Sequence, residues 1–309
     1  SIIICSYNRS ENLAECFSCL ERQALSMPIQ WEVLLVDNNS SDNTKKTIED
    51  RRQHSSLNIR YIFEPEQGLS YARNKGIEEA KGTYLIFIDD DIRVTEKWLQ
   101  SIVSTFKEYD CDAVGGRIHI ESPSSLPAWI TPDMYGFLGH QDFGTQAHQM
   151  DGIKEFPFGG NMAIHKRVIS LIGHFNVEMG RKGTGLIKEE LFKGEETDFF
   201  HRLAAKGGVF YYHPDALVFH KILSHQLKKQ FFLDLHNNAG ALRANQDNST
   251  YKRRLLGTPL FLFPQLFRAI WRYLLIVITK GPNYSMRQLM NVFYFWGMVC
   301  SFHNKQIKQ

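Results

Sequence analysis

Short apolar runs alternate with amphipathic segments over the first third of the chain. Four runs rich in Ile, Val, Leu and Phe predict buried strands, at residues 2–4, 33–36, 59–63 and 84–88. Four segments with apolar residues at helical spacing predict helices, at residues 10–20, 44–52, 70–80 and 96–109. Strand and helix therefore alternate four times, which predicts an α/β fold with a mostly parallel sheet flanked by helices.

The pattern from residue 113 to residue 222 is less regular. Apolar runs predict strands at residues 113–120, 161–164, 209–212 and 216–219, and an amphipathic segment predicts a helix at 195–206. The stretch 121–154 is rich in proline and is predicted to be mostly loop. We expect residues 1–112 and 113–222 to form two halves of one domain.

After about residue 223 the chain is expected to form a helical, aromatic-rich extension, residues 223–309. Residues 255–302 are rich in Phe, Leu, Trp and Tyr, with basic residues interspersed. No stretch reaches the ~18 uncharged apolar residues of a spanning helix, so a helix in the membrane interface fits better. The basic triplet 252–254 would favour an anionic surface. Alternatively, the aromatic side chains pack against the rest of the domain or a partner chain.

Composition and charge narrow the range of functions. The 309 residues are 43% hydrophobic and 22% charged, which is typical of a globular protein rather than a disordered one. The formal net charge of +3 is too small to indicate nucleic-acid binding. The five cysteines are scattered and do not resemble a disulfide framework, so we expect reduced thiols in a cytosolic setting.

Polar side chains follow three of the predicted strands where each strand ends. The segment 6–9 follows the first strand, Asp37 the second and the segment 89–91 the fourth. Because ligands bind at the carboxyl ends of strands in open parallel sheets, these clusters predict one ligand site. The glycine fingerprints of dinucleotide-binding proteins and P-loop nucleotidases are absent after the first strand, which disfavours both classes.

The consecutive carboxylates Asp89, Asp90 and Asp91 indicate a bound cation. Adjacent carboxylates at the end of a buried strand repel one another, and a divalent cation removes that repulsion. Oxygen ligands suit Mg²⁺ or Mn²⁺, and Asp89 and Asp91 point to the same side of an extended strand. Such a metal would bridge the phosphates of a nucleoside diphosphate. The alternative is a solvated acidic turn.

Six short motifs follow one another along the chain. They are residues 1–9 (SIIICSYNR), 36–42 (VDNNSSD), 68–76 (GLSYARNKG), 87–91 (FIDDD), 159–162 (GGNM) and 194–198 (GEETD). In this order they resemble the motifs of family 2 glycosyltransferases of the GT-A, Rossmann-like fold. The resemblance covers roughly residues 1–220 and is specific because six motifs recur in order. It implies an inverting, metal-dependent transferase of the bacterial polysaccharide type.

The resemblance implies a site for a nucleotide-sugar donor within residues 1–112. Tyr7 would stack on the donor base, and Asp37 would form a hydrogen bond with it. The remaining donor-binding residues would be Ser6, Arg9, Arg73, Asp89 and Asp90. Asp91 and Asp89, which match the D-x-D positions, would bind the metal together with His220.

These residues also have purely structural explanations. Tyr7 could pack against the edge of the sheet, and Asp37 could cap the following helix, a position that favours Asp. Arg73 could pair with the glutamates at 78 and 79 on its own helix. His220 could be an ordinary polar residue at a strand end.

Inverting transfer requires a base that takes the proton of the acceptor hydroxyl. The segment 194–196 resembles the family's acidic pair, whose second member is the usual base; here it is Glu196, and Glu195 could share the role. Alternatively, both carboxylates only favour the start of a helix, where the helix dipole attracts negative charge.

Residues 113–222 are expected to bind the acceptor. Gly160 and Asn161 would lie against the acceptor or donor sugar, because glycine permits close approach of the backbone. Trp129 would offer a platform for an acceptor sugar, or would belong to the core.

The sequence therefore predicts transfer of a sugar from a nucleoside diphosphate, UDP by analogy, to a saccharide or lipid-linked saccharide in cell-surface polysaccharide synthesis. We expect a protein at the inner face of the cell membrane, in peripheral contact with it. A homo-oligomer is compatible with the sequence, and nucleic acid is not an expected partner. Two alternatives stay open: a nucleotidyltransferase, which would release pyrophosphate, and a non-catalytic sugar-binding or scaffold protein.

Overall fold

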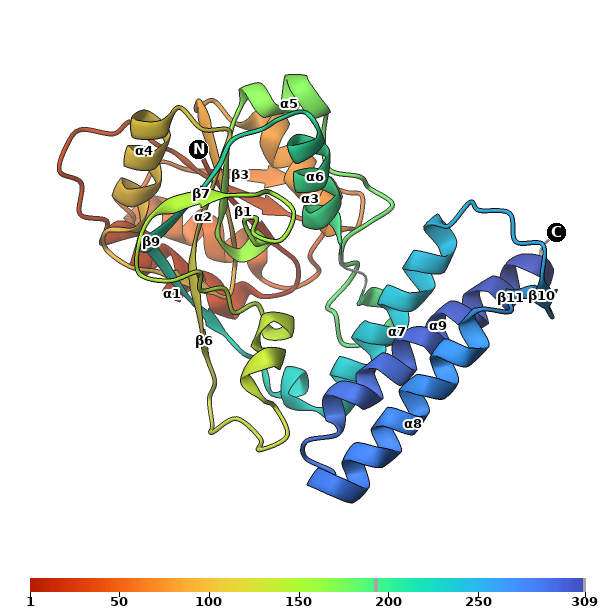
Figure 1. Cartoon of the computed structure of the whole chain (residues 1–309). Helices are drawn as coiled ribbons and strands as arrows, with labels where there is room; N and C mark the ends of the chain where they lie inside the picture. The colour runs from red at the N-terminus through yellow and green to blue at the C-terminus, as the bar shows by residue number, and fades with distance from the viewer. Residues whose placement is uncertain (192–193, 308–309) are drawn as a thin grey trace. The chain divides into compact units, whose positions relative to one another are not determined.

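The computed structural model describes residues 1–191 and 194–307 and divides the chain into two units (Figure 1). The first unit contains Ser1–Glu121, Gly139–Thr184 and Lys193–Lys221; the second contains Ser122–Leu138, Gly185–Phe192 and Ile222–Gln309. The last change of unit, at Ile222, lies next to the boundary expected from composition. Two segments inside the expected 113–222 half instead belong with the C-terminal helices.

Parallel strands form the centre of the first unit, in the order β3 (Ile59–Phe63), β2 (Val33–Asp37), β1 (Ile2–Ser6) and β4 (Tyr84–Asp89). Ile2 and Ile4 belong to one apolar core cluster and Ile3 to the other, because alternate side chains leave opposite faces of a strand. Both faces of the sheet are therefore buried, as is typical of parallel sheets covered by helices.

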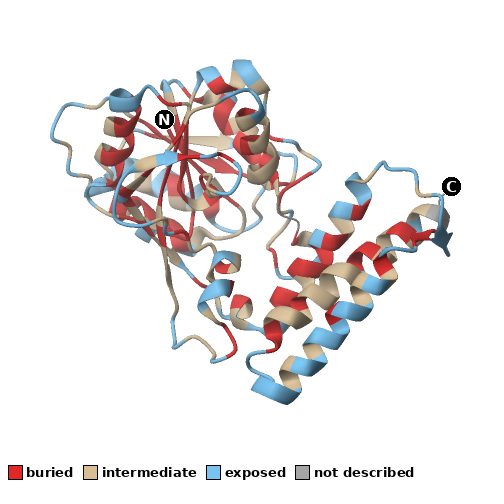
Figure 2. Cartoon of the chain, in the orientation of Figure 1, coloured by how far each residue is buried: buried red, intermediate tan, exposed pale blue. Residues whose placement is uncertain are grey.

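Helices cover both faces of this sheet. The helices α1 (Ser10–Glu21), α2 (Thr44–His54) and α4 (Trp98–Tyr109) pack into the core cluster that contains Ile2. The helices α3 (Leu69–Glu79), α5 (Arg167–Ile172) and α6 (Glu195–Ala205) pack into the cluster that contains Ile3. Figure 2 shows the strands largely buried between helices whose outer surfaces are exposed.

A mixed set of strands extends the sheet beyond β4. They are β5 (Ile92–Val94), β6 (Ala113–Glu121), β7 (His148–Met150), β8 (Met162–His165) and β9 (Phe210–Lys221). β8 pairs antiparallel with β4 and β6, whereas β6 and β9 are parallel. The sequence predicted two strands where β9 is one. Pro214 lies where the pairing with β6 shifts register, so the proline does not end the strand.

Three helices dominate the second unit: α7 (Lys229–Gln246), α8 (Leu262–Lys280) and α9 (Met286–Ile307). Short elements complete both units: β10 (Arg254–Leu255), β11 (Thr258–Pro259), and the 3-10 turns η1 (Pro132–Leu138), η2 (Gly159–Asn161), η3 (Lys188–Glu190) and η4 (Ser224–Leu227). α7 and α9 meet backbone to backbone. A Cβ atom on Gly240 would lie 1.9 Å from the Tyr294 carbonyl oxygen, and one on Gly297 would lie 2.1 Å from that of Asn237.

Among the described residues, α8 alone is long and apolar enough to cross a membrane by length and composition. Only 11% of its most apolar stretch is buried. The sequence shows no uncharged apolar run of spanning length at this helix, because Arg268 and Arg272 lie within it.

Candidate active site

The carboxyl ends of the central parallel strands meet at one edge of the sheet. Ser6, the last residue of β1, is the register partner of Asp37 on β2. Cys5, one residue earlier, is the partner of Asp89 on β4. The three polar clusters that the sequence placed at strand ends therefore lie side by side, as expected for an open parallel sheet.

Asp37 is held in a fixed position at this edge. Its side chain is buried, with one oxygen accepting a hydrogen bond from the Ser40 backbone N–H (2.9 Å) and the other from the Tyr61 hydroxyl (2.7 Å). α2 begins only at Thr44, whose N–H is bound by Asp42 (2.9 Å), so Asp37 does not cap that helix. A carboxylate has further acceptor capacity, and Asp37 can still accept a bond from a ligand.

Ser6, Arg9 and Asp90 bind one another. The Ser6 hydroxyl and the Arg9 Nη1 donate to the two oxygens of Asp90 at 2.6 and 3.2 Å. Ser6 and Asp90 are both buried, and burial raises the pKa of Asp90 to about 7 against the opposing effect of Arg9. The structure thus gives these expected donor-binding residues a different set of contacts: they fix the turn between β4 and β5. Tyr7, between Ser6 and Arg9, is partly exposed.

Asp91 lies between Arg9 and His220. Its Oδ2 accepts a bond from Arg9 Nη1 (2.9 Å), and its buried Oδ1 has no hydrogen-bond partner and lies 3.5 Å from His220 Nε2. The antiparallel pairing of β5 with β9 brings the histidine there, because Ile92 is the register partner of His220. Burial opposes ionisation of Asp91, but His220 and Arg9 outweigh it and lower the pKa of Asp91 below its usual value.

Arg73 of α3 lies at the centre of a cluster of carboxylates. The residue is 1% exposed, and its two terminal nitrogens donate to Glu195 Oε1 (3.0 Å) and Glu196 Oε1 (3.2 Å). Arg73 Nη2 also lies 4.0 Å from Asp89 Oδ1. The guanidinium therefore links residues from β4 and α6, and its described contacts differ from both the nucleotide contact and the surface ion pair that the sequence suggested. Lys75 makes the surface pair with Glu78 and Glu79 instead.

Two glycines of η2 lie directly against these carboxylates. A Cβ atom on Gly159 would lie 1.9 Å from Glu196 Oε1 and 2.3 Å from Arg73 Nη2. A Cβ atom on Gly160 would lie 3.8 Å from Asp89 Oδ2, which is ordinary contact. The backbone here can approach the cluster only because residue 159 has no side chain.

The side chain of Asn161 is buried and forms hydrogen bonds with protein groups, not with an acceptor. It is 1% exposed, and its Oδ1 accepts a bond from Trp98 Nε1 (2.8 Å). Its Nδ2 donates to the carbonyl oxygens of Ala216 (2.7 Å) and Arg117 (3.1 Å). The amide is thus satisfied by protein groups, which corrects the expectation that Asn161 faces a sugar.

Trp129 belongs to the second unit. The residue is 9% exposed, and its ring packs edge to face on Phe232, with centroids 5.2 Å apart. Lys229 Nζ lies 5.9 Å from the ring centroid. Trp129 is therefore part of the packed interior of the second unit, and little of its ring surface is exposed to a sugar.

Asn38 is a residue of this edge to which the sequence analysis gave no role. Its Oδ1 accepts bonds from the Gly68 N–H (2.8 Å) and Gln67 Nε2 (3.1 Å), and its Nδ2 donates to the Glu66 carbonyl oxygen (2.6 Å). Asn38 therefore holds the segment that leads into α3 and positions Arg73. Its place in the motif at 36–42, next to Asp37, was the available signal.

The residues for a metal are fewer than the sequence predicted. Within residues 1–191 and 194–307, no group of three or more His, Cys, Asp or Glu side chains is arranged to hold an ion. Asp91 and His220 approach each other, whereas Asp89 lies 4.0 Å from the guanidinium of Arg73. The buried Asp91 Oδ1, which accepts no hydrogen bond and lies 3.5 Å from an imidazole nitrogen, still fits a divalent cation that takes its other ligands from phosphate oxygens and water.

Comparison with known proteins assigns the family. The model of glycosyl transferase family 2 matches residues 1–173, more than half of the chain. The chain belongs to glycosyl transferase family 2. This family 2 chain is 39% identical over 127 residues to glycosyltransferase AglE of Haloferax volcanii, which is 40% of each chain.

A second relative is matched over a longer stretch. The chain is 26% identical over 216 residues to the succinoglycan biosynthesis protein ExoM of Rhizobium meliloti, which covers 70% of this chain and 64% of ExoM. The family 2 chain thus spans less than two thirds of the length of these relatives.

Solved structures show the same fold. The mannosyltransferase PcManGT of Pyrobaculum calidifontis, in complex with GDP-Man and Mn²⁺, matches with a TM-score of 0.64 at 15% identity, over 98% of this chain and 87% of that one. TarS 1–349 of S. aureus, in complex with UDP, matches with a TM-score of 0.54 at 15% identity, over 100% and 91%. The expected GT-A fold is confirmed.

Proposed function

We propose that this family 2 chain transfers a sugar from a nucleoside diphosphate, UDP for preference, to a hydroxyl of a saccharide or lipid-linked saccharide, with inversion. One observation carries the proposal: a donor-side carboxylate, Asp89, and an acceptor-side carboxylate, Glu196, approach the same guanidinium, that of Arg73. Sugar transfer needs both sides at one place, whereas a scaffold would need neither.

Glu196 is the better base of the two glutamates. The side chain of Glu195 is 4% exposed, whereas that of Glu196 is 24% exposed and can reach a substrate hydroxyl. Both lie in the first turn of α6, whose dipole favours the ionised carboxylate. Glu196 would take the acceptor proton, while Glu195 holds Arg73 in place.

Asp91 and His220 would hold the metal. A carboxylate oxygen with an imidazole nitrogen favours Mn²⁺ over Mg²⁺, which prefers oxygen ligands throughout. When bound, the ion would neutralise charge on the departing diphosphate. Arg9 keeps Asp91 oriented toward that position, with its second oxygen fixed at 2.9 Å.

Tyr7 and Asp37 would bind the nucleoside, and Asp89 the ribose or sugar. The side chain of Asp89 is 37% exposed, so it is open to a ligand beyond the end of β4. Gly160 would border the sugar, since its backbone lies next to Asp89. We place the activity at the inner face of the cell membrane in polysaccharide assembly. The relative ExoM, named for succinoglycan biosynthesis, supports the assignment to polysaccharide assembly.

The experiment is a donor turnover assay with a panel of nucleotide sugars, with and without Mn²⁺. We expect free sugar and one nucleoside diphosphate from the wild-type chain, enhanced by the metal. Glu196→Gln should retain donor binding and lose at least about a hundredfold in transfer, the usual contribution of a general base. Asp91→Ala should lose the response to metal. Normal transfer by Glu196→Gln would refute the base assignment, and release of pyrophosphate would indicate nucleotidyl transfer.

A further inference from the structure

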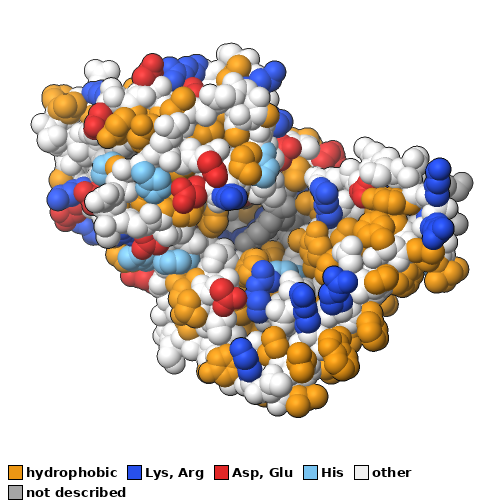
Figure 3. All heavy atoms as spheres, in the orientation of Figure 1, with side chains coloured by type: hydrophobic (Ala, Val, Ile, Leu, Met, Phe, Trp, Pro, Cys, Tyr) orange, Lys and Arg blue, Asp and Glu red, His pale blue; other side chains and the backbone are white. Residues whose placement is uncertain are grey.

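One face of α8 is apolar and open to solvent. Phe267, Trp271, Leu274 and Ile278 recur at intervals of three and four residues, which places them on one side of the helix. All four are exposed, Trp271 by 60% and Ile278 by 82%, whereas the buried residues of α8 are Leu262 and Ala269. We call these four residues the α8 face. Figure 3 shows apolar side chains gathered on the helical part of the chain, with Lys and Arg among them.

The charged side chains of the segment that contains α8 and α9 have one sign. Arg268 and Arg272 are exposed and follow Phe267 and Trp271 directly, so they border the face on one side. Residues 248–309 contain no Asp or Glu. The same stretch contains nine basic residues: Lys252, Arg253, Arg254, Arg268, Arg272, Lys280, Arg287, Lys305 and Lys308. An apolar helix face that is flanked by positive charge is complementary to a surface that is apolar and negative.

We propose that the α8 face docks on an anionic lipid bilayer, with the helix axis parallel to the membrane plane. The apolar side chains would enter the boundary between headgroups and acyl chains, as in interfacial amphipathic helices. Arg268 and Arg272 would reach the lipid phosphates with their long side chains. Trp271 suits this depth because indole rings favour the membrane interface. The proposal rests on the proposed function, for which it names the surface that meets the membrane.

The charge pattern argues against other occupants of the α8 face. A second copy of the chain would bring two basic surfaces together, which like-charge repulsion disfavours. A spanning orientation would place Arg268 and Arg272, the seventh and eleventh of the 19 residues of α8, near the bilayer centre, where charged side chains are costly.

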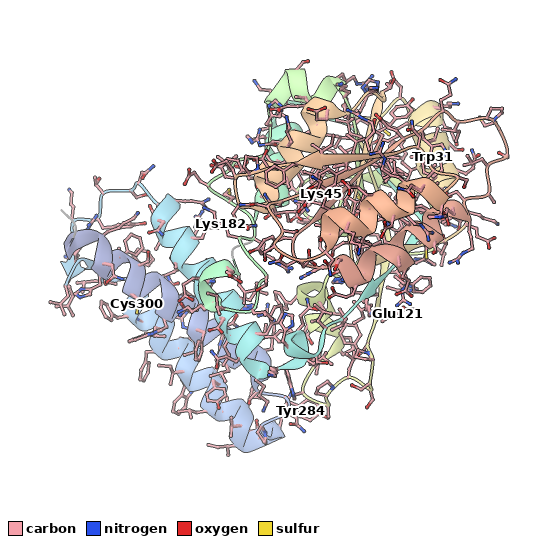
Figure 4. The ribbon with its side chains drawn as sticks, turned by 180° about the vertical axis from the view of Figure 1, so that it is seen from behind. Trp31, Lys45, Glu121, Lys182, Tyr284 and Cys300 are labelled. Atoms are coloured by element: carbon pink, nitrogen blue, oxygen red, sulfur yellow. The ribbon has the colours of Figure 1, made fainter. Side chains whose placement is uncertain are left out.

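Tyr284, which follows α8 and is 64% exposed, adds an aromatic ring suited to the membrane interface (Figure 4).

Co-sedimentation of the full chain with vesicles tests the inference. One set of vesicles is pure phosphatidylcholine and the other also contains phosphatidylglycerol. We expect binding to the mixed vesicles, with release by high salt or alkaline carbonate, because the contact is interfacial and partly electrostatic. Trp271→Asn combined with Ile278→Asn should lower the partition coefficient about tenfold or more, since two large apolar side chains no longer enter the lipid. Arg268→Gln with Arg272→Gln should reduce the preference for phosphatidylglycerol.

The control is Leu171→Asn on α5 of the first unit, an apolar residue outside the α8 face that is as exposed (48%) as Leu274 (47%), and this variant should bind like the wild type. Equal binding by the Trp271/Ile278 variant would overturn the proposal, and so would resistance of the bound wild type to carbonate, which indicates a spanning helix. A wild-type dimer that the same variant converts to monomer, without vesicle binding, would assign the face to a second copy. Donor turnover is measured on the same samples: normal turnover without vesicle binding refutes only the docking surface, and vesicle binding without turnover refutes only the proposed transfer.

Discussion

The two units of the chain use apolar and charged residues in opposite ways. The first unit buries apolar side chains on both faces of its sheet and also buries charged groups, among them Arg73, Glu195, Asp90 and Asp91. The second unit also buries apolar side chains, among them Phe232, Met290 and the cluster around Ala244, Leu262, Met298 and Phe302, but it exposes large apolar side chains along α8. Burying charge is costly unless each group is paired, and exposing large apolar groups is costly unless a partner covers them.

This difference indicates which residues of each unit are suited to binding, and what kind of partner they would bind. In the first unit, the costly residues are charged, they lie at the carboxyl edge of the sheet, and they bind one another in an arrangement suited to a charged ligand. In the second unit, the costly residues are apolar, and many of them lie on α8, an arrangement suited to a surface. Substitutions that affect one unit should therefore leave the measured property of the other unchanged.

The largest effect is expected at the glycine contact between α7 and α9. Gly240→Leu would place a side chain where the Tyr294 carbonyl oxygen lies 1.9 Å from a Cβ position. The helices must separate, and we expect a loss of about 4 kcal/mol or more in the free energy of unfolding, beyond ordinary overpacking. Urea denaturation followed by circular dichroism measures it. Gly136→Ala, also in the second unit, is the control, because its Cβ would meet nothing within 4 Å.

Gly240→Leu also tests whether the first unit binds nucleotide independently of the second unit. If the second unit loses its helices, nucleotide binding by the first unit should persist, because the donor residues all lie in the first unit. Loss of nucleotide binding in Gly240→Leu, with binding kept in Gly136→Ala, would show that the first unit depends on the second for its fold.

The second effect concerns Arg73. Arg73→Met would leave the buried Glu195 carboxylate without its guanidinium, and breaking a buried pair costs about 3–5 kcal/mol of stability. Removing the guanidinium raises the folded-state pKa of this buried carboxylate, so the loss of stability should be largest at high pH and shrink as pH falls through that pKa. Unfolding measured at about pH 8 and about pH 5 tests the sign.

The matched control for Arg73→Met is Arg93→Met in the same unit. Arg93 pairs with Glu15 at 2.7 Å and also with Glu121, and these three side chains are 29%, 47% and 41% exposed. Such surface pairs contribute about 1 kcal/mol or less, with little dependence on pH over this range. Similar losses in the two variants would mean that the burial of Arg73 does not govern its energetics.

The sequence predicted the central strands and their polar ends, because long apolar runs between helical patterns have few alternatives. It missed β5 and β7, which have three residues each, too few to show a period of two. The sequence placed Ser6, Asp90 and Asn161 in motifs, but it did not predict which groups their side chains contact. A motif gives residue types in a fixed order, and it does not tell whether a side chain faces a ligand or a neighbouring residue.

The ion pairs of Arg73 could not be predicted at all. Glu195 lies 122 positions away along the chain, and the contact exists because α3 and α6 pack on the same face of the sheet. The proximity of Asp91 and His220 likewise depends on the pairing of β5 with β9, and β5 itself was missed. Both features arise from tertiary packing, which local sequence patterns do not encode.

The smallest effect separates two adjacent glycines of the first unit. Gly159→Ala would place a methyl group 1.9 Å from Glu196 Oε1, whereas in Gly160→Ala the nearest atom is the end of the Ile92 side chain at 3.3 Å. The same methyl group would lie 2.3 Å from Nη2 of the buried Arg73, so both side chains must shift, and we expect a loss of about 1–3 kcal/mol in the free energy of unfolding. Displacing the base by about 1 Å should lower kcat roughly a hundredfold, with little change in donor affinity. Steady-state kinetics of the two variants measures the difference, since Gly160→Ala should retain most of its activity. Equal kcat values for the two variants would show that Glu196 does not take the proton of the acceptor. Glu195 would then be the remaining candidate for the base.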